Sequence, residues 1–237
     1  MRMGELEGLR RQLKANLEKV QERIERALSR ALRPKESLKI LGASKKQAPE
    51  KIQILYELGV KLFGENYVQE AEKKIEALKD LPIEWHFIGR LQTNKVKKAL
   101  RLFKVIETLD RIELAEELDK RARAVNIKIP VLIEINIGRE KSKAGIFPEE
   151  LKAFAEKLLN FSHIEVRGLM CLPPYEEDPE KVRPYFAKMR ELFEELKPLF
   201  GEAFSDLSMG TSNDFEVAIE EGATIVRLGT ILFGKRE

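Results

Sequence analysis

Short apolar segments alternate with longer amphipathic segments along most of the chain. Residues 5–31 place leucines at helical spacing among charged residues, which predicts a long amphipathic helix that Pro34 ends. Eight short β-rich runs follow, namely LKILGA, VKLFGE, EWHFIG, FKVIETLD, PVLIEINI, IEVRGLMCL, FSDLSMG and TIVRLG. Charged segments with a helical period lie between runs, at 65–78, 94–102, 111–125, 148–160, 179–200 and 213–221.

Short strands that are apolar on both faces and separated by helices indicate a parallel sheet with helical crossovers. Eight such strands predict an α/β fold, a single (β/α)8 TIM-type barrel preceded by a long N-terminal helix. The alternative is an open doubly wound sheet. No Gly/Ser linker or low-complexity tract divides the chain, so we expect one domain over 1–237, with the helix at 1–34 and the barrel at 38–234.

Composition narrows the classes of function. The 237 residues include 43 Lys+Arg and 40 Asp+Glu, and a net charge of +3 gives no general case for binding nucleic acid or a membrane surface. One cysteine, Cys171, permits no intrachain disulfide, and with two histidines it makes a poor metal site. The sequence shows no signal-peptide pattern and no apolar run of membrane-spanning length. We therefore expect a soluble, cytoplasmic protein.

Reactive groups of such a barrel belong at the C-terminal ends of its strands. Lys45 follows the first run and is a candidate Schiff-base amine. That chemistry needs a neutral amine, whereas the pKa of lysine in water is about 10.4. Desolvation or a neighbouring cation must therefore lower the pKa of this residue. Strand alternation sends Lys46 to the opposite side, and we expect it to be a solvated loop charge.

The last two runs end in segments typical of an anion site. SMGTSND, at 208–214, sets a glycine among hydroxyls, and RLGT, at 227–230, closes the final run. Barrels often bind phosphate with the loops after strands seven and eight. The alternative is a pair of tight turns with a helix cap. A Schiff-base lysine together with a phosphate cradle suits a phosphorylated aldehyde, and pyridoxal 5′-phosphate (PLP) is the commonest such cofactor.

Six segments together resemble the pyridoxal phosphate homeostasis proteins: GASKK, FGENYVQE, WHFIGRLQTNK, INIGREKSKAGI, VRGLMCLPP and LSMGTSNDFEVAIEEGATIVRLGTILFG. They span residues 38–234. The resemblance implies a barrel of the alanine-racemase N-terminal type with PLP held as an aldimine on Lys45. It implies that Arg227 faces the pyridine nitrogen and that Asn66 and His86 lie near the cofactor. The implied phosphate cradle consists of Ser208, Met209, Gly210, Gly229 and Thr230.

Two kinds of function follow from this resemblance. Alanine racemases need a second acid/base, a tyrosine from a C-terminal β-domain, and this chain stops at Glu237. We expect all four tyrosines to be packing residues, namely Tyr56, Tyr67, Tyr175 and Tyr185. The favoured hypothesis is a non-catalytic protein that stores, buffers or delivers PLP, with PLP-dependent apoenzymes as candidate partners. The alternatives are a slow PLP-dependent amino-acid racemase and a class I aldolase.

Overall fold

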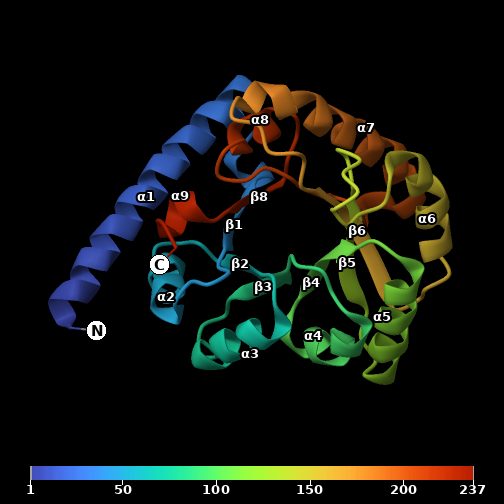
Figure 1. Ribbon diagram of the computed structural model, residues 1–237, viewed down its shortest axis with the longest axis horizontal. Coiled ribbons are helices and arrows are strands. Elements are labelled where there is room, and N and C mark those ends of the chain that lie inside the picture. The colour runs from blue at the N-terminus through green and yellow to red at the C-terminus, as the bar shows by residue number, and fades with distance from the viewer. Residues whose placement is uncertain (1, 237) are drawn as a thin grey trace.

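The computed structural model describes residues 2–236 and contains a closed parallel barrel. Its strands pair in sequence order, and β8 pairs with β1 to complete the ring, as Figure 1 shows. The strands are β1 (Lys39–Ala43), β2 (Leu62–Glu65), β3 (Glu84–Phe87), β4 (Val105–Leu109), β5 (Ile129–Ile135), β6 (Ile164–Cys171), β7 (Asp206–Ser208) and β8 (Ile225–Leu228). The closure confirms the predicted TIM-type barrel and excludes the open doubly wound sheet.

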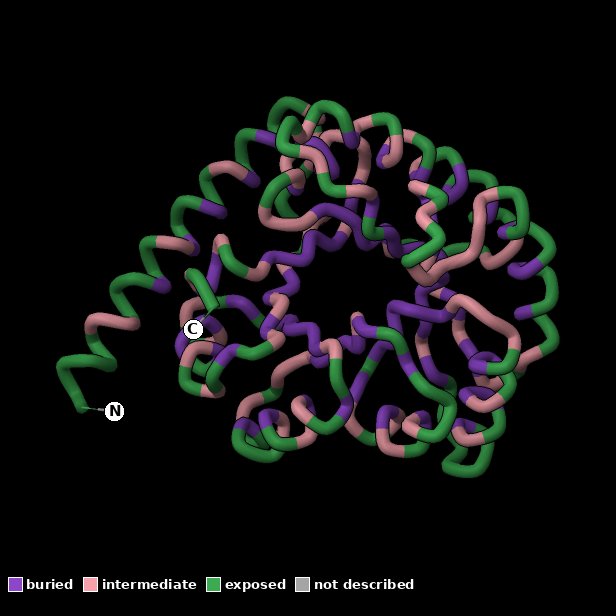
Figure 2. Tube along the Cα trace, viewed as in Figure 1, coloured by how far each residue is buried: buried purple, intermediate pink, exposed green. Residues whose placement is uncertain are grey.

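A helix follows each strand, and one long helix precedes the first. The helices are α1 (Met3–Arg30), α2 (Pro49–Glu57), α3 (Val68–Ala77), α4 (Val96–Leu102), α5 (Ile112–Ala124), α6 (Leu151–Leu158), α7 (Arg183–Phe200), α8 (Phe215–Glu220) and α9 (Thr230–Phe233). Exposed residues lie on the outer rim of the helices and buried ones on the strands (Figure 2). Within residues 2–236, no helix has the length and apolar character needed to cross a membrane.

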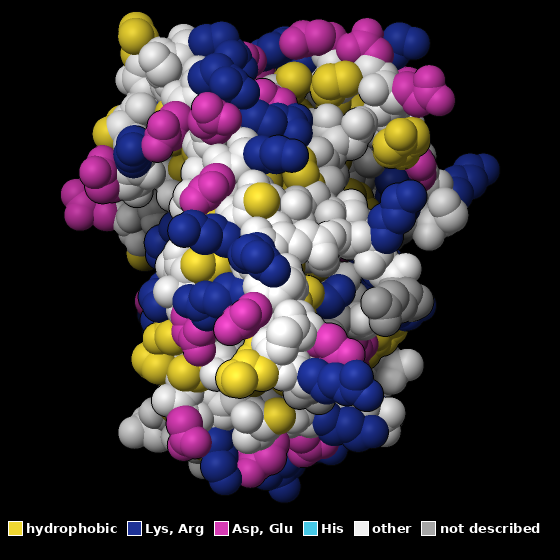
Figure 3. Space-filling model, turned by 90° about the vertical axis from the view of Figure 1, so that its left-hand side faces the viewer, with side chains coloured by type: hydrophobic (Ala, Val, Ile, Leu, Met, Phe, Trp, Pro, Cys, Tyr) yellow, Lys and Arg dark blue, Asp and Glu magenta, His cyan; other side chains and the backbone are white. Residues whose placement is uncertain are grey.

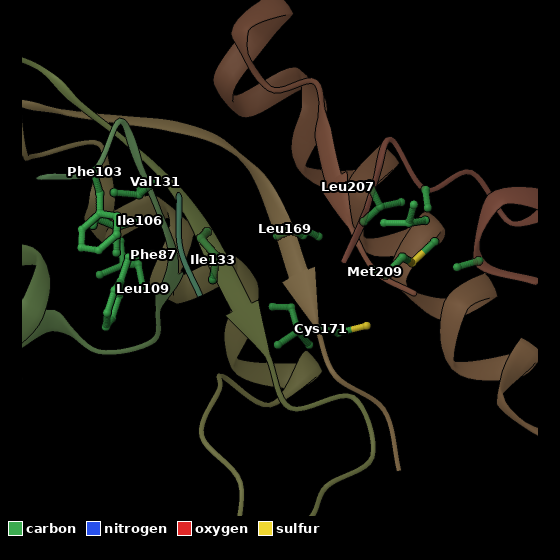
Figure 4. Close-up of a cluster of buried hydrophobic side chains, with 14 of the residues drawn as sticks. Phe87, Phe103, Ile106, Leu109, Val131, Ile133, Leu169, Cys171, Leu207 and Met209 are labelled. Atoms are coloured by element: carbon green, nitrogen blue, oxygen red, sulfur yellow. The ribbon is translucent and has the colours of Figure 1, made fainter. Parts of the chain in front are cut away.

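Apolar side chains pack on both faces of the barrel sheet. The larger cluster lies between the sheet and the helices, and Figure 4 shows part of it, including Phe87, Ile106 and Cys171. Because alternate residues of a strand face opposite sides, the barrel interior holds separate, smaller clusters. One is Leu41, Leu62 and Ile225, and the other is Val105, Leu132 and Met170. Charged side chains share this interior, so it is more polar than the branched apolar filling of most such barrels.

Helix α1 lies outside the barrel against α2, α8 and α9. Its buried stripe consists of Leu13, Leu17, Val20, Ile24, Ala27 and Leu28. Arg10 pairs with Glu57 of α2, and Arg23 pairs with Glu216 of α8. Acidic and basic side chains interleave over the face of the molecule on this side (Figure 3). The helix thus covers the outside of the barrel where β8 meets β1.

Candidate functional site

Lys45 lies in the turn between β1 and α2. The Ser44 amide donates to the Gly64 carbonyl at 3.0 Å, which ties the turn to β2. Lys46 is exposed and adopts a left-handed backbone with φ of 61°, so its side chain is the solvated loop charge that the sequence predicted. Lys45 is half-buried, and its Nζ lies 5.9 Å from the ring centroid of Tyr67.

The position of Tyr67 corrects the expectation that every tyrosine is a packing residue. Tyr67 is the residue before α3 and is 54% exposed. Its ring faces the Lys45 ammonium at a distance that permits a cation–π contact. Side chains of this loop, including Asn66 and Tyr67, line a cavity of about 350 Å³ together with Arg90 and Lys95. Tyr67 is therefore a phenol at the barrel mouth, next to the candidate amine.

A buried ion cluster supports the Lys45 turn. Lys74 of α3 donates from Nζ to the Ser44 carbonyl at 2.6 Å and to Oε1 of both Glu65 and Glu70 at 2.7 Å. The Ser44 hydroxyl donates to Glu65 at 2.9 Å, and the Lys46 amide donates to Glu70 at 2.6 Å. Burial raises the pKa of Glu65, against the opposing effect of the Lys74 ammonium.

Two chain segments converge at the neighbouring strand ends, after β7 and β8. The Ile231 amide donates to the Ser212 hydroxyl at 3.3 Å, which joins the two loops. Among the described residues, the amides of Gly229 and Thr230 donate to no protein acceptor. A Cβ added to Gly229 would meet only Ala43, at 3.7 Å and beyond, so the glycine leaves open space there. Free N–H donors beside an unfilled glycine face fit a small anion such as phosphate.

The first part of the predicted cradle is more constrained. The Met209 amide donates to the Ile225 carbonyl at 3.1 Å, and its side chain packs in the large apolar cluster (Figure 4), so this amide is not free for an anion. The Ser208 hydroxyl accepts a hydrogen bond from Arg227 at 2.9 Å. Gly210 has a φ of 99°, in the region that favours glycine. The cradle assignments of Ser208, Met209 and Gly210 stay predictions.

Arg227 is fixed inside the barrel rather than projecting from its mouth. It is 6% exposed, and besides the bond to Ser208 it donates from Nη2 to the Cys171 carbonyl at 2.8 Å. Burial opposes a lowered pKa for Glu107 on β4, but the hydrogen bond and charge of His86, with a smaller effect of the Arg227 charge, lower that pKa. The guanidinium is thus held between β6, β7 and β8, beneath the strand ends that carry the free amides.

His86 occupies the same interior and forms two ion pairs. Its Nδ1 lies 2.7 Å from Glu107 and its Nε2 lies 2.9 Å from Glu84. Burial alone would lower the pKa of His86, but the hydrogen bonds to both carboxylates outweigh burial and raise the pKa. The hydrogen bond from His86 is the main reason that the pKa of Glu84 falls to about 2. Both ring nitrogens are occupied, so direct contact between His86 and a cofactor stays a prediction, as does that of Asn66.

Known proteins resemble this chain over almost its whole length. The family model of the alanine racemase N-terminal domain matches residues 10–237. A pyridoxal phosphate homeostasis protein of Aquifex aeolicus is 56% identical, over 93% of this chain and 97% of the relative. The chain belongs to the pyridoxal phosphate homeostasis protein family. This confirms the family that the sequence segments indicated.

Two solved structures extend this family comparison. PipY of Synechococcus elongatus, solved with PLP bound, is 34% identical with a TM-score of 0.79, covering 90% of this chain and all of that one. An unknown protein from Bifidobacterium adolescentis is 32% identical with a TM-score of 0.89, covering 95% of this chain and 96% of that one. Both are similar to the present barrel from end to end.

Sequence reasoning missed several charged groups on the strands and helices of this family member, among them the buried Glu107 and the half-buried Glu134. Glu107 and Glu134 lie within otherwise apolar strand runs, and that placement was the signal that could have found them. Burial, reinforced by the Asp110 carboxylate, raises the pKa of Glu134 to about 7. Lys74 had no such signal, because it follows helical spacing on a charged helix and its burial depends on the turn after β1.

Proposed function

We propose that the chain binds PLP at the C-terminal end of its barrel and acts in PLP homeostasis, by storage, buffering or delivery, without efficient catalysis. One observation carries this proposal: a lysine amine and a pair of unused backbone amides occur on hydrogen-bonded neighbouring strands. β1 leads into Lys45 and β8 leads into Gly229, with Gly42 opposite Leu228 in the register. The PLP-bound relative PipY supports the same cofactor here.

Each site residue has a distinct role under this proposal. Lys45 would bind the aldehyde of PLP through its amine, and the amides of Gly229 and Thr230 would hold the phosphate. Arg227 would face the pyridine nitrogen, and because a guanidinium only donates hydrogen bonds, it would favour an unprotonated nitrogen there. An unprotonated ring is a weaker electron sink. This arrangement favours retention of the cofactor over chemistry at a substrate carbon.

Borohydride reduction tests the attachment point. The purified protein should be yellow, and reduction should bleach the visible imine band and fix pyridoxyl phosphate on Lys45, as read by peptide mass spectrometry. Lys45→Ala should abolish the label, whereas the matched control Lys46→Ala should retain it. A label on Lys46, or on Lys39 at the opposite end of β1, would overturn the assignment. A colourless protein that turns over a phosphorylated sugar would instead be a class I aldolase.

Amino-acid turnover tests the non-catalytic part of the proposal. We expect only trace racemisation or transamination, with bound PLP quantified in the same samples. Turnover of about 1 s⁻¹ or more, the ordinary range of enzymes, would overturn the carrier role. Tyr67 would then be the first acid/base to test, by Tyr67→Phe, because its phenol lies near Lys45 whereas the nitrogens of His86 are occupied.

A further inference from the structure

We infer that Lys74 is a positioning residue for Lys45, a role that rests on the proposed function. Lys74 lies on α3 and its side chain is 7% exposed. Its ammonium reaches the backbone on both sides of Lys45: directly at the Ser44 carbonyl, and through Glu70 at the Lys46 amide. One buried cation therefore fixes the residue before the reactive lysine and the residue after it.

Every hydrogen bond of the Lys74 ammonium goes to another residue of this cluster. The three N–H donors of the Lys74 ammonium have three acceptors, namely the Ser44 carbonyl and one oxygen each of Glu65 and Glu70. Those two oxygens accept again, from the Ser44 hydroxyl and the Lys46 amide. The second Glu65 oxygen is buried without a hydrogen-bond partner among the described residues. The side-chain hydrogen bonds of Glu65 therefore all go through one oxygen, which accepts from Lys74 and from the turn residue Ser44.

General stability does not account for such a cluster. Buried ion pairs lose hydration, and well-packed apolar residues often replace them at no cost in stability. The turn itself is demanding, because Lys46 has a left-handed backbone, which is unfavourable for a residue other than glycine. Hydrogen bonds on both sides of Lys45 offset that cost and hold one conformation. The cluster therefore selects the backbone from which the Lys45 side chain extends.

Positioning matters because the neutral Lys45 amine must add to the face of the aldehyde carbonyl, after which the carbonyl oxygen leaves as water, while the phosphate stays fixed. A misplacement of about 1 Å can slow such a reaction by about 100-fold. Lys74→Met removes the ammonium and frees both sides of the turn. We expect imine formation with PLP to slow by about 10- to 100-fold, followed by the rise of the visible band. Pyridoxine 5′-phosphate, which has an alcohol in place of the aldehyde, should bind with unchanged affinity.

The acceptor role of Glu70 gives a second test that does not depend on burying a methionine. Glu70→Gln keeps an oxygen for Lys74 and the Lys46 amide and should retain the wild-type rate. Glu70→Ala removes the acceptor of both hydrogen bonds, and loss of the one that holds the Lys46 amide should by itself slow imine formation by about fivefold, the effect of about 1 kcal/mol. Lys73→Met, which alters the exposed neighbour on the same helix, is the matched control.

Hydrogen exchange of the Lys46 amide in the cofactor-free protein gives an independent readout. Protection should fall in Lys74→Met and Glu70→Ala and persist in Glu70→Gln and Lys73→Met. A wild-type imine rate in both Lys74→Met and Glu70→Ala would overturn this inference alone. Parallel losses of imine formation, pyridoxine 5′-phosphate affinity and thermal stability would also overturn it, in favour of a purely structural role. A wild-type protein that forms no imine on Lys45 would overturn the proposed function first.

Discussion

Replacement of Gly229 by alanine should separate cofactor binding from folding. Gly229 has a φ of −106°, and the added Cβ would lie 3.7 Å from the Ala43 carbonyl oxygen and 3.8 Å from the Ala43 Cβ, which are ordinary contacts. The free energy of unfolding should therefore change by less than about 1 kcal/mol. The methyl group would stand beside the free amides and keep a phosphate from close approach. Loss of one charge-assisted hydrogen bond, about 1.5–3 kcal/mol, weakens binding by about 10- to 100-fold.

Gly210 supplies the control for this comparison. Its φ of 99° disfavours any side chain, and an added Cβ would lie 2.6 Å from the Ala218 Cβ. Gly210→Ala should therefore lower the free energy of unfolding by about 1–3 kcal/mol. Calorimetric titration with pyridoxine 5′-phosphate and denaturant unfolding give the two measurements. The reasoning fails if Gly229→Ala binds like wild type, or if it loses as much stability as Gly210→Ala.

Three further predictions concern buried groups. The stabilisation by protonated His86, which His86→Gln removes, should be fully present below pH 6.5, the ordinary pKa of histidine, and should be lost as pH rises through the raised pKa of His86. Because the pKa of Glu107 is lowered, the stabilisation by its carboxylate should be lost as pH falls below 4.5. The free energy of unfolding of wild type and His86→Gln, measured across pH, checks both. Burial raises the pKa of Cys171 to about 12, so a maleimide should label this thiol only in denaturant. Gly168→Ala should leave little soluble folded protein in an expression assay, because its Cβ would lie 1.7 Å from the Asp206 carbonyl oxygen.

The barrel could be predicted because its evidence is local. Most positions of each strand run are apolar and each helix repeats its own period, so the order of elements can be predicted without knowledge of any contact. Helix α1 was expected over 5–31 and is observed over Met3–Arg30. The strand ends then located Lys45 and Gly229 by position along the chain alone. Closure of the sheet followed from the number of strands.

The hydrogen bonds of Lys74 and Arg227 could not be predicted, because the residues that they join are distant in sequence. Lys74 and the Ser44 carbonyl are 30 residues apart, and Arg227 and the Cys171 carbonyl are 56 apart. Such pairs depend on the register between strands, which neither spacing nor composition fixes. The same limit applies to His86. Its position in β3 could be predicted from the sequence, but its hydrogen bond to Glu107 depends on the register of β3 against β4.

The position of α1 affects when this helix can pack during synthesis of the chain. The helix is translated before the barrel, yet the segments that it packs against include α8 and α9, which follow the last two barrel strands. Its apolar stripe therefore has no complete partner surface until the last two strands and their helices have been translated, and contacts between such distant segments form slowly. Until then the nascent chain carries part of that stripe uncovered.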